Sequence, residues 1–67
     1  MDIKINGNKM VVPNDVNTVS KLINHLEISN PVVIVEHNNV ILQKDEHEKT
    51  IIKSGDAIEF IQFVGGG

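Results

Sequence analysis

The stretch that decides the fold is AIEFIQFV, residues 57–64. Its β-branched and aromatic side chains favour an extended strand, and it is the longest strand candidate in the chain. We expect it inside a sheet, because a long apolar strand at a sheet edge invites pairing with other molecules. The residues that follow it, 65–67, are all glycine and have no side chains to pack. The strand is therefore expected to lead into a flexible tail.

Alternation along this strand separates two faces. Ile58 and Phe60 should face the core, whereas Ile61 and Phe63 should point the other way, and Val64 lies where the strand leaves the sheet. Apolar side chains on the solvent side of a sheet mark a partner surface, unless a loop covers them. We therefore expect Ile61, Phe63 and Val64, here called the docking patch, to bind a partner.

The first twelve residues predict a β-hairpin with DIKI and KMVV as its strands. Either Asn6-Gly7 or Gly7-Asn8 could form the turn. The first choice would put Ile5 opposite Asn8, an apolar side chain against a polar one. The second choice puts Ile5 opposite Met10, so that two apolar side chains share one face, and we prefer this register.

One helix is predicted after the hairpin. Its apolar residues recur at positions i, i+3, i+4 and i+7, namely Val19, Leu22, Ile23 and Leu26. Asn17 or Thr18 is expected as the N-cap, and Pro31 limits the helix to about three turns. His25 falls outside the apolar stripe, so we expect it at the surface.

Shorter strands should follow the helix. Four β-branched residues in a row, 32–35, predict a buried strand. Asn38 and Asn39 tolerate positive φ and can reverse the chain into a strand at 40–42. A further short strand is expected at 50–52, before the long final strand.

The order of these elements restricts the topology. Placing the final strand beside the first and parallel to it gives a mixed sheet of about four or five strands around one main helix. An open meander with a detached helix would leave the apolar helical stripe in water. We therefore predict an α+β fold of the β-grasp, or ubiquitin-like, type, with residues 1–64 as one domain and 65–67 as the flexible tail.

Composition excludes several functions. The chain has 67 residues, a net charge of −3 and no apolar run that could span a membrane, so neither nucleic acid nor membrane is expected as a partner. No basic segment precedes an apolar one at the start of the chain, which predicts a cytoplasmic protein. Without cysteine, the chain offers no disulfide, no thiolate metal site and no thiol nucleophile.

The polar residues predict no catalytic centre. His25, His37 and His47 lie too far apart in sequence to suggest a metal site by their spacing. The cluster KDEHEK, residues 44–49, is expected to be a solvated surface loop or turn. No phosphate-binding loop, GxSxG or HExxH motif occurs. We therefore expect a protein that is not an enzyme and holds no metal.

Three segments resemble a known family. The strongest match is GDAIEFIQFVGGG (55–67), and IKINGN (3–8) and VVIVEHN (32–38) support it. Together the chain resembles, over its whole length, the sulfur carrier proteins of thiamin biosynthesis, the ThiS family. His37 and Lys44 stand where many members have arginine, a difference that bears on contacts with partners rather than on the chemistry.

This resemblance implies a sulfur carrier and co-substrate. A ubiquitin-activating-type adenylyltransferase would use ATP to adenylate the carboxylate of Gly67, and a cysteine desulfurase system would supply the sulfur that makes a thiocarboxylate. Thiazole synthase would take that sulfur to build the thiazole ring of thiamin. No cofactor would be bound stably, because the partner uses the ATP, and the free carrier would be a monomer.

The glycine tail fits this implied role. It would pass through narrow channels in the partner active sites, where a Cβ on Gly65 or Gly66 would collide with the walls. Two alternatives stay open. One is the sulfur carrier of molybdopterin synthesis, which shares the fold and the diglycine end, and the other is a β-grasp interaction module whose tail does nothing.

Overall fold

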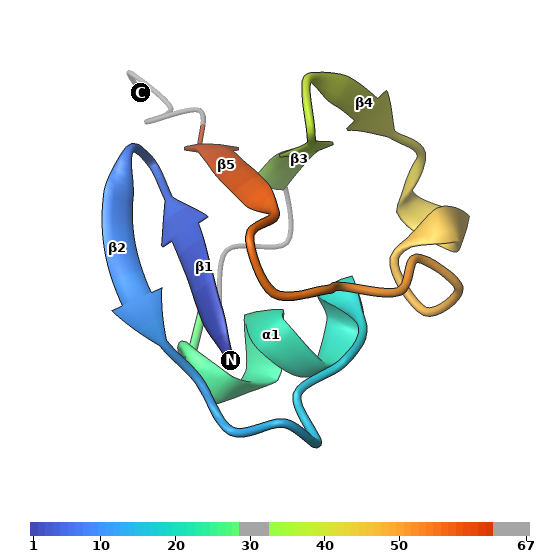
Figure 1. The fold of residues 1–67 in the computed structure, drawn as a ribbon. Coiled ribbons are helices and arrows are strands. Elements are labelled where there is room, and N and C mark those ends of the chain that lie inside the picture. Colours follow the sequence, from blue (N-terminus) through green and yellow to red (C-terminus); the bar gives the residue numbers. More distant parts are fainter. Residues whose placement is uncertain (29–32, 63–67) are drawn as a thin grey trace.

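Over residues 1–28 and 33–62, which the computed structural model describes, a five-stranded mixed sheet packs against one α-helix (Figure 1). The order across the sheet is β2-β1-β5-β3-β4, with β1 and β5 parallel and the other neighbours antiparallel. The elements are β1 Asp2–Ile5, β2 Asn8–Val11, α1 Val19–His25, β3 Val33–His37, β4 Val40–Leu42, the 3-10 turn η1 Lys44–Glu46 and β5 Ala57–Gln62. The predicted β-grasp arrangement is confirmed, including the final strand inside the sheet.

The register preferred for the first hairpin is wrong. The turn is Asn6-Gly7, with φ values of 50° and 83°, and it places Ile5 opposite Asn8. A two-residue turn that matches the twist of the strands needs positive φ at both positions, which Asn-Gly supplies at least cost. This turn preference outweighs the two unmatched pairs of the register, Ile5 with Asn8 and Asp2 with Val11.

Other contacts bury Ile5 and Val12, whereas Met10 and Val11 of β2 stay 37% and 77% exposed. Ile5 pairs with Ile58 on its other side, in the parallel register of β1 with β5. Beyond β2, Val12 donates its N–H to the Met1 carbonyl at 3.0 Å, and the Met1 amino group donates to the Val12 carbonyl at 2.7 Å. Val12 is thereby held in the core. The sheet thus buries these residues without the register that we expected.

The predicted helix begins at its expected cap. Lys21 donates its backbone N–H to Thr18 Oγ1 at 3.2 Å, which makes Thr18 the N-cap. Val19 and Leu22 are both 0% exposed, and the other two residues of the apolar stripe are partly buried against the core. His25 is exposed, as expected. The stripe therefore faces the sheet.

The helix ends earlier than the proline limit, after 7 residues. Glu27 takes φ of +58° and donates its N–H to the Asn24 carbonyl at 3.1 Å. Ile28 donates to the Ile23 carbonyl, also at 3.1 Å. These two bonds form a Schellman turn, which satisfies the last carbonyls of the helix. Pro31 lies outside the described residues, and the helix has already ended before it.

The core lies between α1 and the concave side of the sheet. Its buried residues come from strands, helix and loops: Ile3, Ile5, Val12, Val16, Val19, Leu22, Val35, Ile52 and Ile58. Phe60 packs against this cluster while remaining partly exposed. Burying one such aliphatic side chain stabilises a fold by roughly 1.5–3 kcal/mol. A domain of this size depends on nearly all of them.

The second half of the chain contains one confirmed turn and one correction. Asn38 and Asn39 have φ of 50° and 69° and join β3 to β4, as predicted. The segment 50–52 does not join the sheet, because it pairs with the residues that precede the helix. Ile51 forms a single bridge with Thr18, and no strand is assigned there. The segments predicted as the domain end and the tail, 63–67, lie outside the described residues.

Replacing Glu27 by glycine should raise the free energy of unfolding by about 0.5–1 kcal/mol. The left-handed conformation costs a side-chain-bearing residue roughly 1–2 kcal/mol, and this relief exceeds the extra entropy that glycine gives the unfolded chain. Urea unfolding of both proteins measures the difference. Glu27→Ala is the control, because it removes the charge near the helix C-terminus but keeps the Cβ. An equal gain from alanine would assign the effect to charge instead of backbone conformation.

Candidate functional site

β5 is the strand that leads to the glycine tail, and it is held on both sides. It pairs in parallel with β1 and in antiparallel register with β3, from His37 opposite Ile58 to Val33 opposite Gln62 (Figure 1). A central strand has little freedom to shift, because both of its edges are bonded. The tail residues 65–67, and Phe63 and Val64 of the docking patch, lie outside the described residues. What the structure describes is the strand that precedes them, β5.

Asn6 extends the pairing of β5 beyond the end of β1. Its backbone N–H donates to the Ile58 carbonyl at 2.9 Å, and its side-chain Oδ1 accepts from the Phe60 N–H at 2.9 Å. The same residue forms the first hairpin turn. No periodic pattern indicates this contact, because it joins residues 54 positions apart through a side chain.

A polar cluster fixes the beginning of β5. Asp56 Oδ2 accepts from the Lys53 N–H at 2.9 Å and lies 2.7 Å from His37 Nε2, while Oδ1 accepts from Asn38 Nδ2 at 3.2 Å. Asn38 also exchanges bonds with Ala57: its N–H donates to the Ala57 carbonyl at 2.8 Å, and its Oδ1 accepts the Ala57 N–H at 2.9 Å. The β3–β4 turn is therefore fastened to the turn before β5.

The cluster also sets the charge of Asp56. Partial burial alone would raise the pKa of this carboxyl. The hydrogen bonds from Lys53, His37 and Asn38, with the electrostatic effect of His37, outweigh burial and hold the pKa below its ordinary value of 3.8. Asp56 is therefore a carboxylate at neutral pH, and the folded state stabilises that form.

The two faces of β5 differ as predicted. Ile58 is 1% exposed and Phe60 packs against the core, whereas Ile61, on the other face, is 41% exposed. Ile61 lies opposite Ile34 of β3. At this degree of exposure, Ile61 is not covered by a loop among the described residues. The described member of the docking patch is thus available at the surface, and its role in binding stays a prediction.

A family model described as the ThiS family matches residues 2–67. The chain belongs to the ThiS family. It is 32% identical over 65 residues to the sulfur carrier protein ThiS of Bacillus subtilis (strain 168), covering 97% of this chain and 98% of that protein. It is also 35% identical over 63 residues to the uncharacterized protein ycf40 of Trieres chinensis, covering 94% of this chain and 85% of the relative.

Solved structures agree with this ThiS membership. The crystal structure of the thiamine biosynthesis protein ThiS from Geobacter metallireducens matches with a TM-score of 0.86 at 33% identity, covering 100% of both chains. The solution structure of a thiamine biosynthesis protein from the same organism matches with a TM-score of 0.82 at 33% identity, covering 100% of this chain and 88% of that one. The β-grasp fold of this ThiS-family chain is therefore shown.

The two residues that depart from the pattern expected of ThiS proteins have different surroundings. His37 is half-buried, and its Nε2 lies 2.7 Å from Asp56 Oδ2 in the polar cluster. Lys44 is exposed at the start of η1. A bearing of either residue on partner contacts stays a prediction.

The expected solvated loop at 44–49 is wrong for His47 of this ThiS-family chain. Its side chain is 8% exposed, and its Nε2 is buried without a hydrogen-bond partner. The His47 carbonyl accepts the Ser20 N–H at 2.9 Å, which draws the loop against the start of α1. The other residues of the cluster are exposed.

The described ranges hold neither a metal-binding cluster nor a membrane-spanning helix. Residues 1–28 and 33–62 contain no group of three or more His, Asp or Glu side chains arranged to hold a metal ion. Within the same part of the chain, α1 is too short to cross a membrane, and no other helix there has the length and hydrophobicity to do so.

Replacing Asp56 by asparagine should lower the free energy of unfolding by about 1–2 kcal/mol near neutral pH, because charge-assisted bonds become neutral ones. The folded pKa lies below the unfolded one, so the carboxylate stabilises the fold fully above the unfolded pKa. That contribution is lost as pH falls through the folded pKa. The difference between wild type and variant should therefore shrink below about pH 4.

Urea unfolding across this pH range is the measurement. Asp15→Asn is the control, since Asp15 is exposed and accepts no hydrogen bond among those found in the described residues. It should change stability little at any pH. A difference for Asp56→Asn that stayed constant down to strongly acidic pH would contradict the assigned role of its charge.

Proposed function

We propose that this chain is a sulfur carrier for the formation of the thiazole ring of thiamin, and that its partners supply all catalytic groups. The observation that carries the proposal is the ThiS match over residues 2–67, which includes the glycine tail. Relatives named as a sulfur carrier protein and a thiamine biosynthesis protein support it. The fold supports it too, since β5, which ends just before residues 63–67, is a central strand of the sheet.

The chemistry takes place at Gly67. Its carboxylate oxygen attacks the α-phosphorus of ATP held by a ubiquitin-activating-type adenylyltransferase, and pyrophosphate leaves. The terminal sulfur of a cysteine persulfide, formed by a cysteine desulfurase, then attacks the acyl carbon and expels AMP with one former carboxylate oxygen. A second thiol reduces the resulting acyl disulfide, giving a thiocarboxylate and a disulfide between the two thiols. Activation is needed because a free carboxylate is a poor electrophile.

The tail and the docking patch have different roles in binding: the tail enters the partner's active site, and the patch contributes the favourable burial. Gly65 and Gly66 have no Cβ, so they can enter narrow channels in the adenylyltransferase and in thiazole synthase. Ordering each tail residue costs roughly 1–2 kcal/mol of conformational entropy. Burial of Ile61, Phe63 and Val64 against the partner offsets this cost. In this scheme residues 1–64 are the docking domain and 65–67 the reactive segment.

The location, oligomeric state and cofactor use of the carrier follow from the same scheme. The carrier acts in the cytoplasm as a monomer between encounters, and it binds neither nucleic acid nor membrane. ATP is a substrate of the activating partner, so the carrier itself holds no cofactor. The ThiS relatives favour thiamin over molybdopterin as the end product.

Deleting Gly67, or extending the chain beyond it, should abolish sulfur transfer while leaving the fold intact. The carboxylate that reacts would be displaced from the position that the partner's channel defines. Mass spectrometry after incubation with ATP, adenylyltransferase and a sulfur source measures the exchange of one oxygen for one sulfur. An extended protein that accepts sulfur without prior cleavage would contradict the assignment, and transfer of that sulfur by thiazole synthase distinguishes the thiamin route.

Replacing Phe63 by alanine should weaken binding to the adenylyltransferase by about 1–3 kcal/mol, the range of a buried aromatic anchor. The same change at Phe60 should instead reduce folding stability, toward the lower end of about 3–5 kcal/mol, because this ring packs against the core but is partly exposed. Calorimetric titration and urea unfolding of both variants test the pair. Equal stability losses would mean that Phe63 belongs to the core.

A further inference from the structure

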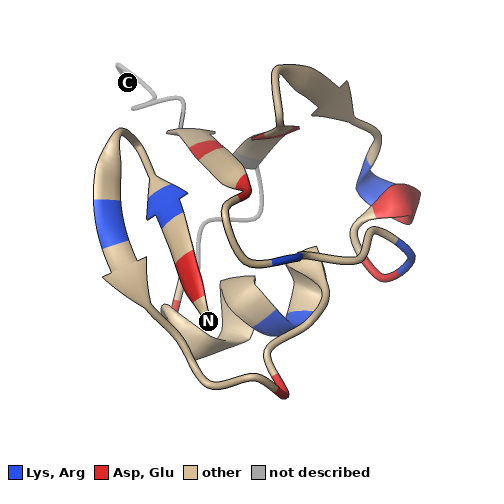
Figure 2. Ribbon diagram, in the orientation of Figure 1, with Lys and Arg blue, Asp and Glu red and all other residues tan. Residues whose placement is uncertain are grey.

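The sheet face turned away from α1, here called the outer face, carries two pairs of like charges. Lys4 of β1 lies directly opposite Lys9 of β2, and Glu36 of β3 lies directly opposite Glu59 of β5. In Figure 2, blue segments lie on β1 and β2 and red segments on β3 and β5, with a further red segment at the start of β1. Like charges placed directly across from each other destabilise a sheet.

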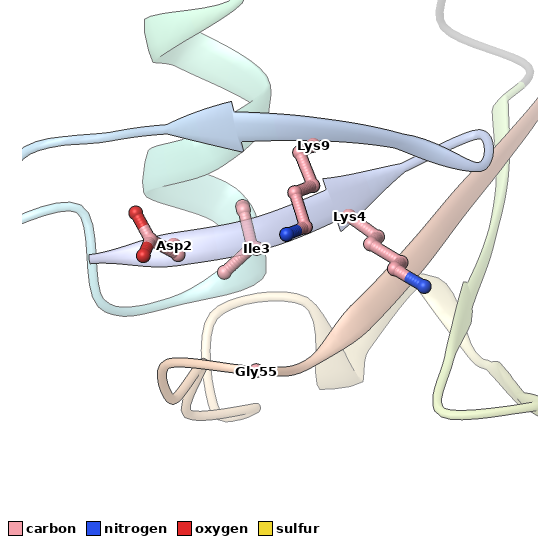
Figure 3. A pocket seen from close by; sticks show the side chains of 5 residues that line it. All are labelled: Asp2, Ile3, Lys4, Lys9 and Gly55. Atoms are coloured by element: carbon pink, nitrogen blue, oxygen red, sulfur yellow. The ribbon is translucent and has the colours of Figure 1, made fainter.

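Within the part of the chain that the structure describes, neither pair has an ion-pair partner. Among residues 1–28 and 33–62, the ion pair found within 4.0 Å is that of His37 with Asp56, and it involves none of these four side chains. Lys4, Lys9 and Glu59 are exposed and Glu36 is half-buried. Figure 3 shows both lysine side chains beside a small hollow that Asp2, Ile3 and Gly55 also line. The charges are therefore free to meet groups from outside.

The pairs form an ordered series with the docking patch. Lys4 is the neighbour of Ala57 at the beginning of β5, and Glu59 and Ile61 follow at alternate positions of that strand. Alternate residues of a strand share one face and lie about 7 Å apart. From the start of β5 toward the tail, the outer face therefore presents positive charge, then negative charge, then the apolar Ile61.

We propose that this series orients the carrier on its activating enzyme, which presents basic side chains to Glu36 and Glu59 and acidic side chains to Lys4 and Lys9. The inference rests on the proposed function and adds the chemistry of the partner surface. Complementary charges on the two surfaces steer the encounter and fix its direction. The enzyme thus receives the carrier with the end of β5, and so the tail, directed toward its active site.

The alternatives fit the surface less well. The hollow beside the lysines has a volume of about 100 Å³, whereas small-molecule pockets usually hold roughly 300–1,000 Å³. A polyanion would be repelled by the two glutamates on the same face. A second copy of the chain could match the series in reverse, but two molecules that each carry a net charge of −3 repel each other. A protein surface with both signs of charge satisfies all four side chains.

The decisive variant exchanges the two pairs: Lys4→Glu, Lys9→Glu, Glu36→Lys and Glu59→Lys. The two Lys→Glu changes lower the net charge by four and the two Glu→Lys changes raise it by four, so it stays at −3. Each site also keeps a like-charge pair, so the effect on folding should be small. We expect association with the adenylyltransferase, followed by stopped flow at low salt, to slow by about tenfold or more. The difference should shrink as salt is raised.

A milder pair of variants separates binding from stability. Glu36→Gln with Glu59→Gln should slow association, yet its thermal unfolding midpoint should equal or exceed that of wild type, because a repulsion has been removed. Asp15→Asn with Glu48→Gln makes the same change in net charge at exposed positions away from the outer face and should bind as wild type. Such opposite effects on binding and stability indicate residues kept for recognition.

Each outcome decides between the proposals. If the exchanged variant associates as fast as wild type, the orienting role is overturned, whether or not sulfur is transferred. If wild type binds and the variant does not, but mass spectrometry finds no thiocarboxylate on wild type, the orienting role stands and the carrier function fails. Absence of binding by wild type overturns both. A wild-type dimer in sedimentation that the exchange abolishes would assign the outer face to a second copy.

Discussion

The parallel pairing of β1 with β5 is the constraint on which the rest of the molecule depends. Lys4 donates its N–H to the Asp56 carbonyl and Asn6 to the Ile58 carbonyl, both at 2.9 Å, across more than fifty residues of sequence. Closing so long a loop costs entropy before any contact compensates for it. Helix, core and both hairpins must therefore form around this pairing. The position of β5 thus depends on contacts between the two ends of the chain.

Much of this arrangement could be predicted from hydrophobic spacing. The helical stripe, the burial of Ile58 and the exposure of Ile61 follow from periods of 3.6 and 2, which local sequence displays directly. The central position of the last strand follows from its length and composition. These features depend on where apolar side chains occur, and one sequence is enough to show that.

The failures have a different origin. Matching Ile5 with Met10 predicts one register for the first hairpin, but the backbone demands of Asn6-Gly7 decide another. The error also hid a feature of the outer face, because in the preferred register Lys4 would not lie opposite Lys9. The Asn-Gly dipeptide was the signal that could have corrected it. The burial of His47 and the hydrogen bond from the Phe60 N–H to Asn6 Oδ1 arise from tertiary contacts that no local pattern encodes.

Asn6 illustrates how few amino acids one position of this fold can accept. The turn asks for a residue that tolerates positive φ, and β5 asks for a short side chain whose oxygen reaches the Phe60 N–H. Glycine meets the first demand and leaves the second unmet, serine has the oxygen but is strained by the backbone, and alanine fails both. Asparagine and aspartate remain of the common side chains. The amino acids allowed at residue 6 are thus determined jointly by a local turn and by a strand at the other end of the chain.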